Sequence, residues 1–131
     1  ARVVIGGELL EGEGFFVQPT ILADIDHSMA VAREEVFGPV LGVMPFDDED
    51  AVIALANDNR YGLVASLWTN DLGKAMNLVP RIEAGTVWVN SHTLIDANMP
   101  FGGFKQSGTG RDFGVDWLDA FTETKSVCIR H

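Results

Sequence analysis

Cysteine is almost absent from this sequence of 131 residues, in which Cys128 is the single example. One cysteine excludes an intrachain disulfide and any metal site built from several thiolates. The three histidines, His27, His92 and His131, are far apart, and none has the spacing to another that zinc ligands show. We therefore expect no metal site, structural or surface histidines, a buried Cys128, and a reducing compartment such as the cytoplasm.

Basic residues and long apolar runs are also scarce. The net charge is −10, and the segment from Glu8 to Asp58 carries twelve carboxylates against one base, Arg33. Nucleic acid is disfavoured as a partner, because phosphate binding requires clustered Lys and Arg. No apolar run reaches the roughly 18 residues that a membrane span requires, so we expect no membrane partner. An acidic, solvated surface on an ordinary globular protein is the favoured interpretation.

The first residue is Ala1, so the sequence has no initiator Met, and no apolar stretch typical of a signal peptide follows it. We expect the chain to start inside a longer protein. Its length fits one domain, and no linker or internal repeat is visible, which predicts a single domain over residues 1–131.

Short β-rich runs alternate with helix-like segments along the first 90 residues. Strands are expected at residues 3–5, 20–22, 40–44, 63–68 and 86–89. Apolar side chains recur at i, i+3 and i+4 from Val52 and again from Leu72, which predicts two helices between these strands. The alternation predicts an α/β fold with a mostly parallel sheet flanked by helices.

Aspartates and one asparagine precede the expected helices, where side-chain oxygens cap free backbone N–H groups. The candidate N-caps are Asp47 or Asp48 for the first of these helices and Asn70 or Asp71 for the second. A shorter helix over residues 29–33 would have Asp24 or Asp26 as its cap.

Residues 91–114 are rich in glycine and have no helical or strand period. Gly103 and Gly108 have the spacing of a phosphate-binding loop, but Thr109 stands where that loop requires Lys. A dinucleotide-binding pattern from Gly108 also fails, because its third glycine comes one residue late, at Gly114. We expect instead a backbone that needs positive φ or close approach, in a loop that lines a substrate channel.

Two other features are candidates for catalysis. Glu34 and Glu35 are adjacent carboxylates, which general acid–base chemistry uses, but neighbouring side chains usually point apart. A solvated helix end is the favoured interpretation of that pair. Cys128 lies in a β-like run with no supporting base, so we do not expect it to be a nucleophile.

Four motifs follow one another in a specific order. They are Glu-Val-Phe-Gly-Pro at 35–39, Gly-Thr-Val-Trp-Val-Asn at 85–90, Pro-Phe-Gly-Gly-Phe-Lys-Gln-Ser-Gly at 100–108, and Gly-Arg at 110–111. Over essentially its whole length the chain resembles the C-terminal part of the aldehyde dehydrogenase superfamily. The resemblance implies a piece of the catalytic domain at about 1–121 and a strand at about 122–131 that joins a neighbouring subunit, in homodimers or homotetramers.

The resemblance also implies a chemistry. In the family a Cys thiolate attacks an aldehyde, hydride passes to NAD or NADP, and water hydrolyses the thioester to the carboxylic acid. The resemblance places this chain downstream of both that Cys and the general-base Glu. It therefore implies that no catalytic residue lies in this chain, and that the chain alone is inactive.

Four residues correspond to cofactor and substrate positions of the family. By resemblance, Glu35 accepts hydrogen bonds from the nicotinamide-ribose hydroxyls, and Phe37 lies beside the nicotinamide. Phe101 lines the aldehyde tunnel, and Ile95 falls where the family varies the tunnel wall. Asn90 is expected to be structural and to end the strand before it.

One departure and several details refine the resemblance. Many relatives have Glu after Arg111, whereas this sequence has Asp112, whose carboxylate lies one methylene closer to the backbone. The residues before Pro100 and the segment from Gly114 are most similar to bacterial phenylacetaldehyde dehydrogenase-like enzymes, which implies an aromatic aldehyde. Two alternatives stay open: a non-enzymatic α/β scaffold or oligomerisation module derived from this family, and a related reductase that forms an acyl phosphate or semialdehyde.

Overall fold

A computed structural model describes residues 1–131, apart from the side chain of Asp116. The chain divides into two compact units, Ala1–Leu55 (unit 1) and Ala56–His131 (unit 2). Each unit is described by itself. The expectation of a single domain over residues 1–131 stays a prediction.

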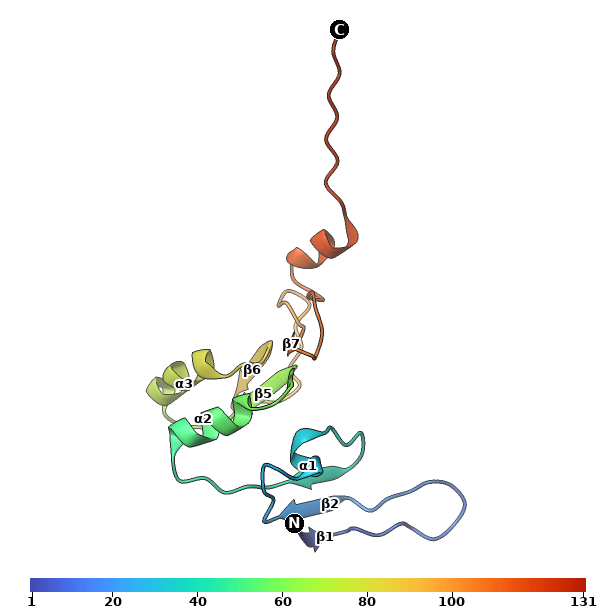
Figure 1. The fold of residues 1–131 in the computed structure, drawn as a ribbon, viewed down its shortest axis with the longest axis vertical. Helices are drawn as coiled ribbons and strands as arrows, with labels where there is room; N and C mark the ends of the chain where they lie inside the picture. Colours follow the sequence, from blue (N-terminus) through green and yellow to red (C-terminus); the bar gives the residue numbers. More distant parts are fainter. The chain divides into compact units, whose positions relative to one another are not determined.

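Unit 1 contains a three-stranded sheet in the order β1-β2-β3 (Figure 1). Its strands are β1 (Arg2–Ile5), β2 (Thr20–Ala23) and β3 (Val40–Gly42). β1 and β2 are antiparallel, whereas β2 and β3 are parallel and are connected through the short helix α1 (Ala30–Arg33). The register places Thr20 beside Val40, so both strands start at the same end of the sheet.

A buried polar residue fixes the start of β2. The Thr20 hydroxyl donates to the Gln18 carbonyl at 2.8 Å and accepts from the Gly7 N–H at 2.9 Å. Gly6 has a φ of +73°, and a Cβ at this position would lie 2.2 Å from the Pro19 carbonyl oxygen. Only glycine fits such a close backbone approach, which positions β1 against β2.

The expected caps of α1 are wrong. Its N-cap is Met29, which makes no side-chain cap bond. The hydroxyl and the backbone N–H of Ser28 donate instead to Asp26 and lower the pKa of that carboxyl. Asp24 pairs with Arg2 at 2.8 Å. Both aspartates lie too far before the helix to reach the second or third N–H of its first turn.

The later helices begin as the sequence predicts. Helix α2 (Glu49–Asn57) spans the boundary between the units, and Asp48 accepts the Ala51 N–H at 2.7 Å. Helix α3 (Leu72–Leu78) is capped by Asp71, which accepts the Lys74 N–H at 3.0 Å. A 3₁₀ turn over Val79–Arg81 follows α3, because Pro80 cannot continue the helix.

In unit 2, α3 connects two parallel strands, β5 (Val64–Leu67) and β6 (Thr86–Val89). The inner side of α3 buries Ala75 and Leu78, and Trp88 of β6 is also buried. A separate antiparallel pair joins β4 (Tyr61–Gly62) to β7 (Phe104–Lys105), which the sequence did not predict because each strand has two residues.

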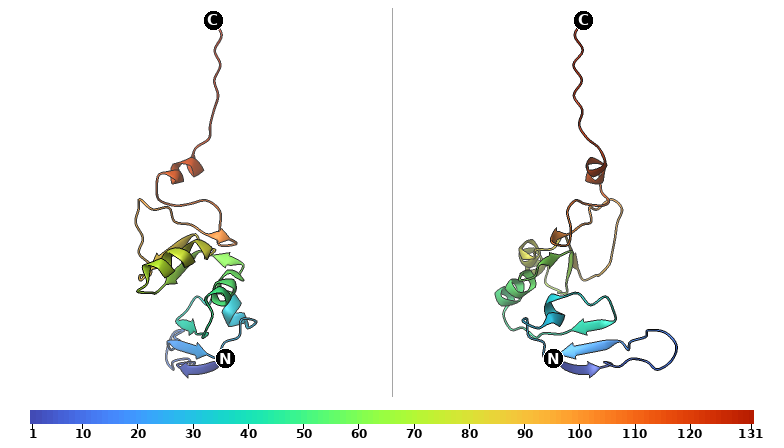
Figure 2. Two further views of the ribbon diagram at one scale, coloured as in Figure 1. Left: turned by 90° about the vertical axis from the view of Figure 1, so that its left-hand side faces the viewer. Right: turned by 45° about the vertical axis from the view of Figure 1, so that its right-hand side comes forward.

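The last ten residues of unit 2 depart from expectation. A short 3₁₀ helix covers Asp116–Phe121, where the sequence favours a short helix, but residues 122–131 form no strand. Figures 1 and 2 show these last residues as an extended ribbon with no strand beside it. Cys128 is therefore exposed, and the expectation that it is buried is wrong for this chain. An extended segment has nothing to bury its side chains against until another strand pairs with it.

The α/β class is confirmed, and its strands form three small sheets. The β2–β3 and β5–β6 pairs are parallel, and the β1–β2 and β4–β7 pairs are antiparallel. Among the described residues, no helix has the length and apolar character needed to cross a membrane.

Candidate functional site

The loop of residues 34–39, which leads from α1 into β3, carries Glu35 and Phe37. Its two ends are tied to regular structure: the Glu34 N–H donates to the Ala30 carbonyl at 2.7 Å, and the Thr20 N–H donates to the Pro39 carbonyl at 2.8 Å. Two tight turns lie between these ends, since Gly38 N–H reaches Val36 O and Val40 N–H reaches Gly38 O, each at 2.8 Å. Backbone hydrogen bonds thus fix the course of this short loop.

Both candidate side chains on this loop face solvent. The Phe37 side chain is 93% exposed, so its ring is open to a ligand. Glu35 is exposed too, and among the side chains that the structure describes its carboxylate has no hydrogen-bond or ion-pair partner. An exposed carboxylate without a partner can accept hydrogen bonds from two neighbouring hydroxyls. Glu35 therefore fits the sugar of a nucleotide.

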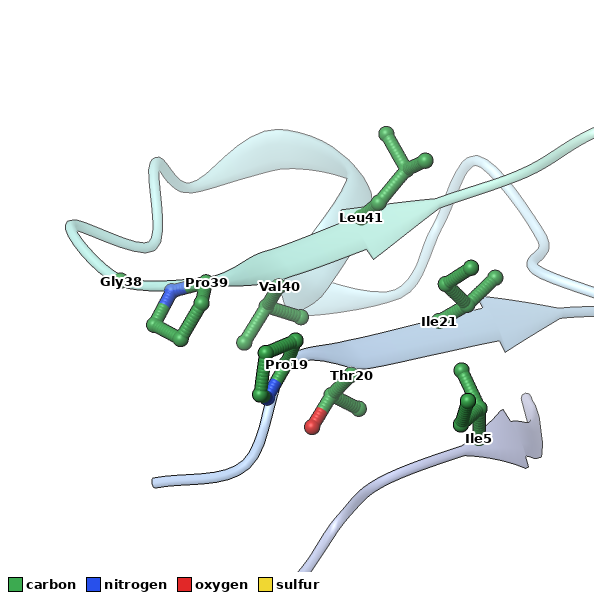
Figure 3. Close-up of a pocket in the computed structure, with 8 residues that line it drawn as sticks. All are labelled: Ile5, Pro19, Thr20, Ile21, Gly38, Pro39, Val40 and Leu41. Carbon is green, nitrogen blue, oxygen red and sulfur yellow. The ribbon is translucent and has the colours of Figure 1, made fainter. Parts of the chain in front are cut away.

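An open groove of about 440 Å³ lies next to this loop in unit 1. It is lined by Ile5, Pro19, Thr20, Ile21, Gly38, Pro39, Val40 and Leu41. Figure 3 shows Pro19, Pro39 and Val40 close together where β2 and β3 begin, with Leu41 pointing to the opposite side from Val40. No charged side chain lines the groove, so it suits an apolar group.

In unit 2, the glycine-rich segment folds into a closed loop between Phe101 and Asp112. Their backbones exchange two hydrogen bonds, of 2.8 Å from Phe101 N–H and 2.7 Å from Asp112 N–H. The Arg111 guanidinium donates to the carbonyls of Gly103 at 3.0 Å and Gly110 at 2.6 Å. It also lies 5.4 Å from the centre of the Phe104 ring. The arginine therefore ties the loop together with its fixed set of donors.

Glycine is required in this segment for close packing and for positive φ, as the sequence predicts. A Cβ on Gly103 would lie 2.4 Å from Ser107, and one on Gly85, which precedes β6 and packs against the segment, would lie 1.6 Å from the Gly102 carbonyl oxygen. Gly108 has a φ of +132°, which side chains rarely tolerate. A partly open hollow of about 180 Å³ lies against the loop and is lined in part by Phe101 and Arg111.

Ile95 lies in the loop of residues 91–99 and is 56% exposed. Hydrogen bonds follow it along the chain: the Gly114 N–H donates to the Ala97 carbonyl at 3.0 Å, and the Met99 N–H donates to the Asp96 carbonyl at 3.0 Å. The Asp96 carboxylate accepts the Asn98 N–H at 2.8 Å and its side-chain amide at 3.0 Å, which lowers the pKa of Asp96. On the C-terminal side of Ile95, loop 91–99 is thus held by its own hydrogen bonds and by one from Gly114.

Asn90 is structural, as expected. Its side chain accepts the Thr69 N–H and donates to the Thr69 carbonyl, each at 2.8 Å. Its φ of +54° turns the chain out of β6. Asparagine tolerates this left-handed conformation better than most residues, so the strand ends here.

Three residues near this loop make contacts that the sequence did not predict. Trp88 donates its indole N–H to the Leu94 carbonyl at 2.7 Å, and Ser66 lies 2.7 Å from the His92 ring. The signal for Trp88 was its place in a β-rich run, because a buried indole needs an acceptor. The pairing of Ser66 with His92 spans 26 residues and has no local signal.

The four residues that the resemblance assigns to the site fall into two pairs. Glu35 and Phe37 lie on one loop of unit 1, whereas Ile95 and Phe101 belong to unit 2. Within unit 2, the Gly114–Ala97 bond and the Phe101–Asp112 pairing connect the loop that carries Ile95 to the glycine-rich segment. Cofactor-side and substrate-side candidates are therefore each supported by their own framework.

Known proteins match this chain over nearly its whole length. Residues 1–127 match the aldehyde dehydrogenase family. A betaine aldehyde dehydrogenase of Rhizobium meliloti is 48% identical over 132 residues, which cover 98% of this chain and 27% of that protein. The chain thus spans about a quarter of the length of the curated relatives it matches.

Solved structures of aldehyde dehydrogenases are also similar to this chain. The indole-3-acetaldehyde dehydrogenase AldA of P. syringae, in complex with NAD+, is 46% identical with a TM-score of 0.91 over 96% of this chain and 26% of that one. An NAD+ complex of aldehyde dehydrogenase from Bacillus cereus is 45% identical with a TM-score of 0.92, over the same shares of the two chains. The ordered motifs, the fold and these similarities agree, and the chain belongs to the aldehyde dehydrogenase family.

Proposed function

We propose that this chain is the C-terminal part of an NAD-dependent aldehyde dehydrogenase, which converts an aldehyde, NAD+ and water to a carboxylic acid, NADH and a proton. The observation that carries this proposal is the 46% sequence identity, over nearly the whole chain, to an enzyme solved with NAD+. NAD, when bound, accepts the hydride. The residues of this chain bind and orient the cofactor and the aldehyde. The nucleophilic Cys and the general-base Glu belong to the preceding part of the enzyme.

Glu35 and Phe37 form the cofactor side of the proposed site. Glu35 holds the nicotinamide ribose through its two hydroxyls, which the free carboxylate on its hydrogen-bonded loop supports. Phe37 presents a flat apolar face that restricts the nicotinamide ring, which its 93% exposure supports. Together the two side chains orient the ring for hydride transfer.

Phe101 and Ile95 form the aldehyde side. Both side chains are apolar, and Phe101 borders the hollow of the glycine-rich loop. A phenyl or indolyl group fits such surroundings, because aromatic rings prefer apolar and edge-to-face contacts. We therefore propose an arylacetaldehyde such as phenylacetaldehyde as the substrate, in line with the indole-3-acetaldehyde that a similar enzyme's name gives.

Betaine aldehyde is the second candidate substrate, because several similar proteins bear that name. Its quaternary ammonium requires the faces of aromatic rings or a carboxylate. The nearest carboxylate in sequence to Ile95 is Asp96, whose oxygen already accepts two hydrogen bonds from Asn98. The aromatic aldehyde is the preferred candidate because the two proposed residues of the aldehyde side, Phe101 and Ile95, are both apolar and uncharged.

The test is to read the gene around this segment and to express the whole protein. An upstream reading frame of several hundred residues with a Cys nucleophile, and NADH formation from phenylacetaldehyde, are expected. Betaine aldehyde, acetaldehyde and NADP are compared in the same absorbance assay. If none of these aldehydes gives NADH, the result contradicts the proposal and favours a non-enzymatic scaffold.

Residues 1–131 expressed alone are expected to give no aldehyde-dependent NADH formation. Turnover by this chain with several aldehydes would contradict the placement of the nucleophile outside it. We also propose that residues 122–131 pair with a strand of a second subunit, forming a homodimer or homotetramer. The mass of the whole protein in light scattering, with and without this segment, tests that assembly.

A further inference from the structure

Loop 91–99 is poorly buried, so its position depends on a small number of contacts. Residues 92–99 are all exposed. On the C-terminal side of Ile95 the loop is held by the bonds of Ala97 and Asp96 described above. On the N-terminal side the contacts come from Trp88 and His92, which fix a different set of atoms.

Trp88 is a rigid anchor for this N-terminal side. Its side chain is buried, at 7% exposure, in strand β6, which pairs with β5 along its full length. The indole N–H reaches across six residues to the Leu94 carbonyl at 2.7 Å. The indole has one donor and no acceptor, so this bond is the way that Trp88 satisfies its polar atom. Leu94 directly precedes Ile95, and the bond therefore restrains the backbone that carries Ile95.

His92 adds a second restraint between the same loop and the β5–β6 sheet. Its ring lies edge-on to the Trp88 indole, with 5.3 Å between the ring centres and 75° between the planes. Its Nδ1 atom lies 2.7 Å from the Ser66 hydroxyl on β5. The two strands therefore hold residues 92 and 94 through separate side chains.

We propose that Trp88 is a positioning residue for aldehyde selection, which it exerts by holding the Leu94 carbonyl and thereby the Ile95 side chain. This inference rests on the proposed function, in which Ile95 lines the path of the aldehyde. Loss of the indole N–H frees the N-terminal half of loop 91–99, and substrate binding must then order it. The effect falls on the aldehyde and not on the cofactor, whose residues Glu35 and Phe37 belong to another loop.

The test uses the whole enzyme with Trp88→Phe, which keeps an aromatic ring and removes the donor. Trp68→Phe is the matched control, because Trp68 is 66% exposed and the same atoms are removed. We expect kcat/KM for phenylacetaldehyde to fall about threefold to tenfold in Trp88→Phe, the ratio that one lost buried hydrogen bond gives. The KM for NAD and all constants of Trp68→Phe should stay within about twofold of the unmodified enzyme.

Amide hydrogen exchange of residues 92–97 provides a readout that does not depend on activity. Exchange should become faster in Trp88→Phe and stay unchanged in Trp68→Phe. Unchanged exchange, or equal losses for aldehyde and NAD, would overturn the inference. If Trp88→Phe fails to fold, Ser66→Ala tests the second restraint by the same two measurements, with the same expected and contrary results.

If the unmodified enzyme oxidises no aldehyde, the proposed function fails, and the role in aldehyde selection fails with it. The exchange measurement then still decides whether Trp88 holds the loop. The two failures are therefore distinguishable.

Discussion

At the scale of single residues, the cofactor side of the proposed site depends on one free carboxylate. In the whole enzyme, Glu35→Gln should lower turnover about tenfold, because hydrogen bonds to a charged acceptor are stronger than those to an amide. Steady-state rates with saturating aldehyde and varied NAD measure the effect. Glu34→Gln, an adjacent exposed carboxylate, is the control. A rate for Glu35→Gln equal to that of the control would count against the assigned role.

On the aldehyde side, the residue that matters most is Phe101. Phe101→Ala removes an apolar wall and should shift the ratio of kcat/KM for phenylacetaldehyde over acetaldehyde about tenfold, with a smaller change for NAD. Phe113→Ala is the control, since Phe113 is also partly exposed, at 42%, in the same segment. Competition between the two aldehydes measures the ratio. An unchanged substrate profile would contradict a role for Phe101 in the tunnel.

At the scale of elements, helix α3 connects the two parallel strands of unit 2 and begins with one side-chain cap. Asp71→Ala removes the acceptor of the Lys74 N–H, and we expect the helix to lose about 1 kcal/mol of stability. Amide exchange over residues 72–78 should accelerate about fivefold as a result. Asn70→Ala, a change at the neighbouring exposed residue, should leave exchange as it was. Equal effects of both changes would show that Asp71 is not a cap.

The sequence predicted those features of the elements that depend on neighbouring residues, and it did not predict those that depend on distant ones. Asp48 and Asp71 stand directly before their helices, so capping was predictable from spacing. For α1 the sequence offered two aspartates at the wrong distance, and neither caps the helix. Strand β7 exists only because Phe104 and Lys105 pair with β4, more than 40 residues earlier in the chain. No local pattern predicts such a pairing.

At the scale of the whole molecule, residues 1–131 leave large apolar side chains exposed in both units. Among them are Phe15, Phe37, Leu72, Phe121 and Ile129. The buried apolar residues of the described side chains are few: Ile25, Ile53, Ala75, Leu78 and Trp88. Exposed apolar surface on this scale marks contact with other protein. In the proposed enzyme, that protein is the preceding polypeptide and a second subunit.

We therefore expect residues 1–131 expressed alone to associate with one another as their concentration rises. Val127→Glu with Ile129→Glu removes two exposed apolar residues from the C-terminal segment and should reduce the apparent mass in light scattering. Thr124→Glu with Ser126→Glu adds the same charge in the same segment without removing an apolar residue. If both double variants reduce association equally, charge repulsion and not the apolar segment is responsible.

The sequence by itself determined the family, the α/β class, two candidate caps each for α2 and α3, and the residues proposed for the site, and the structure selected Asp48 and Asp71 as the caps. These follow from ordered motifs and from short-range spacing, which a linear pattern contains. Only the tertiary structure decided that Arg111 ties the glycine-rich loop, that Asn90 clamps Thr69, and that Trp88 holds Leu94. Each of these contacts depends on where a fixed strand or turn directs one side chain, and the hydrogen bonds form only after the backbone has brought their partners within reach.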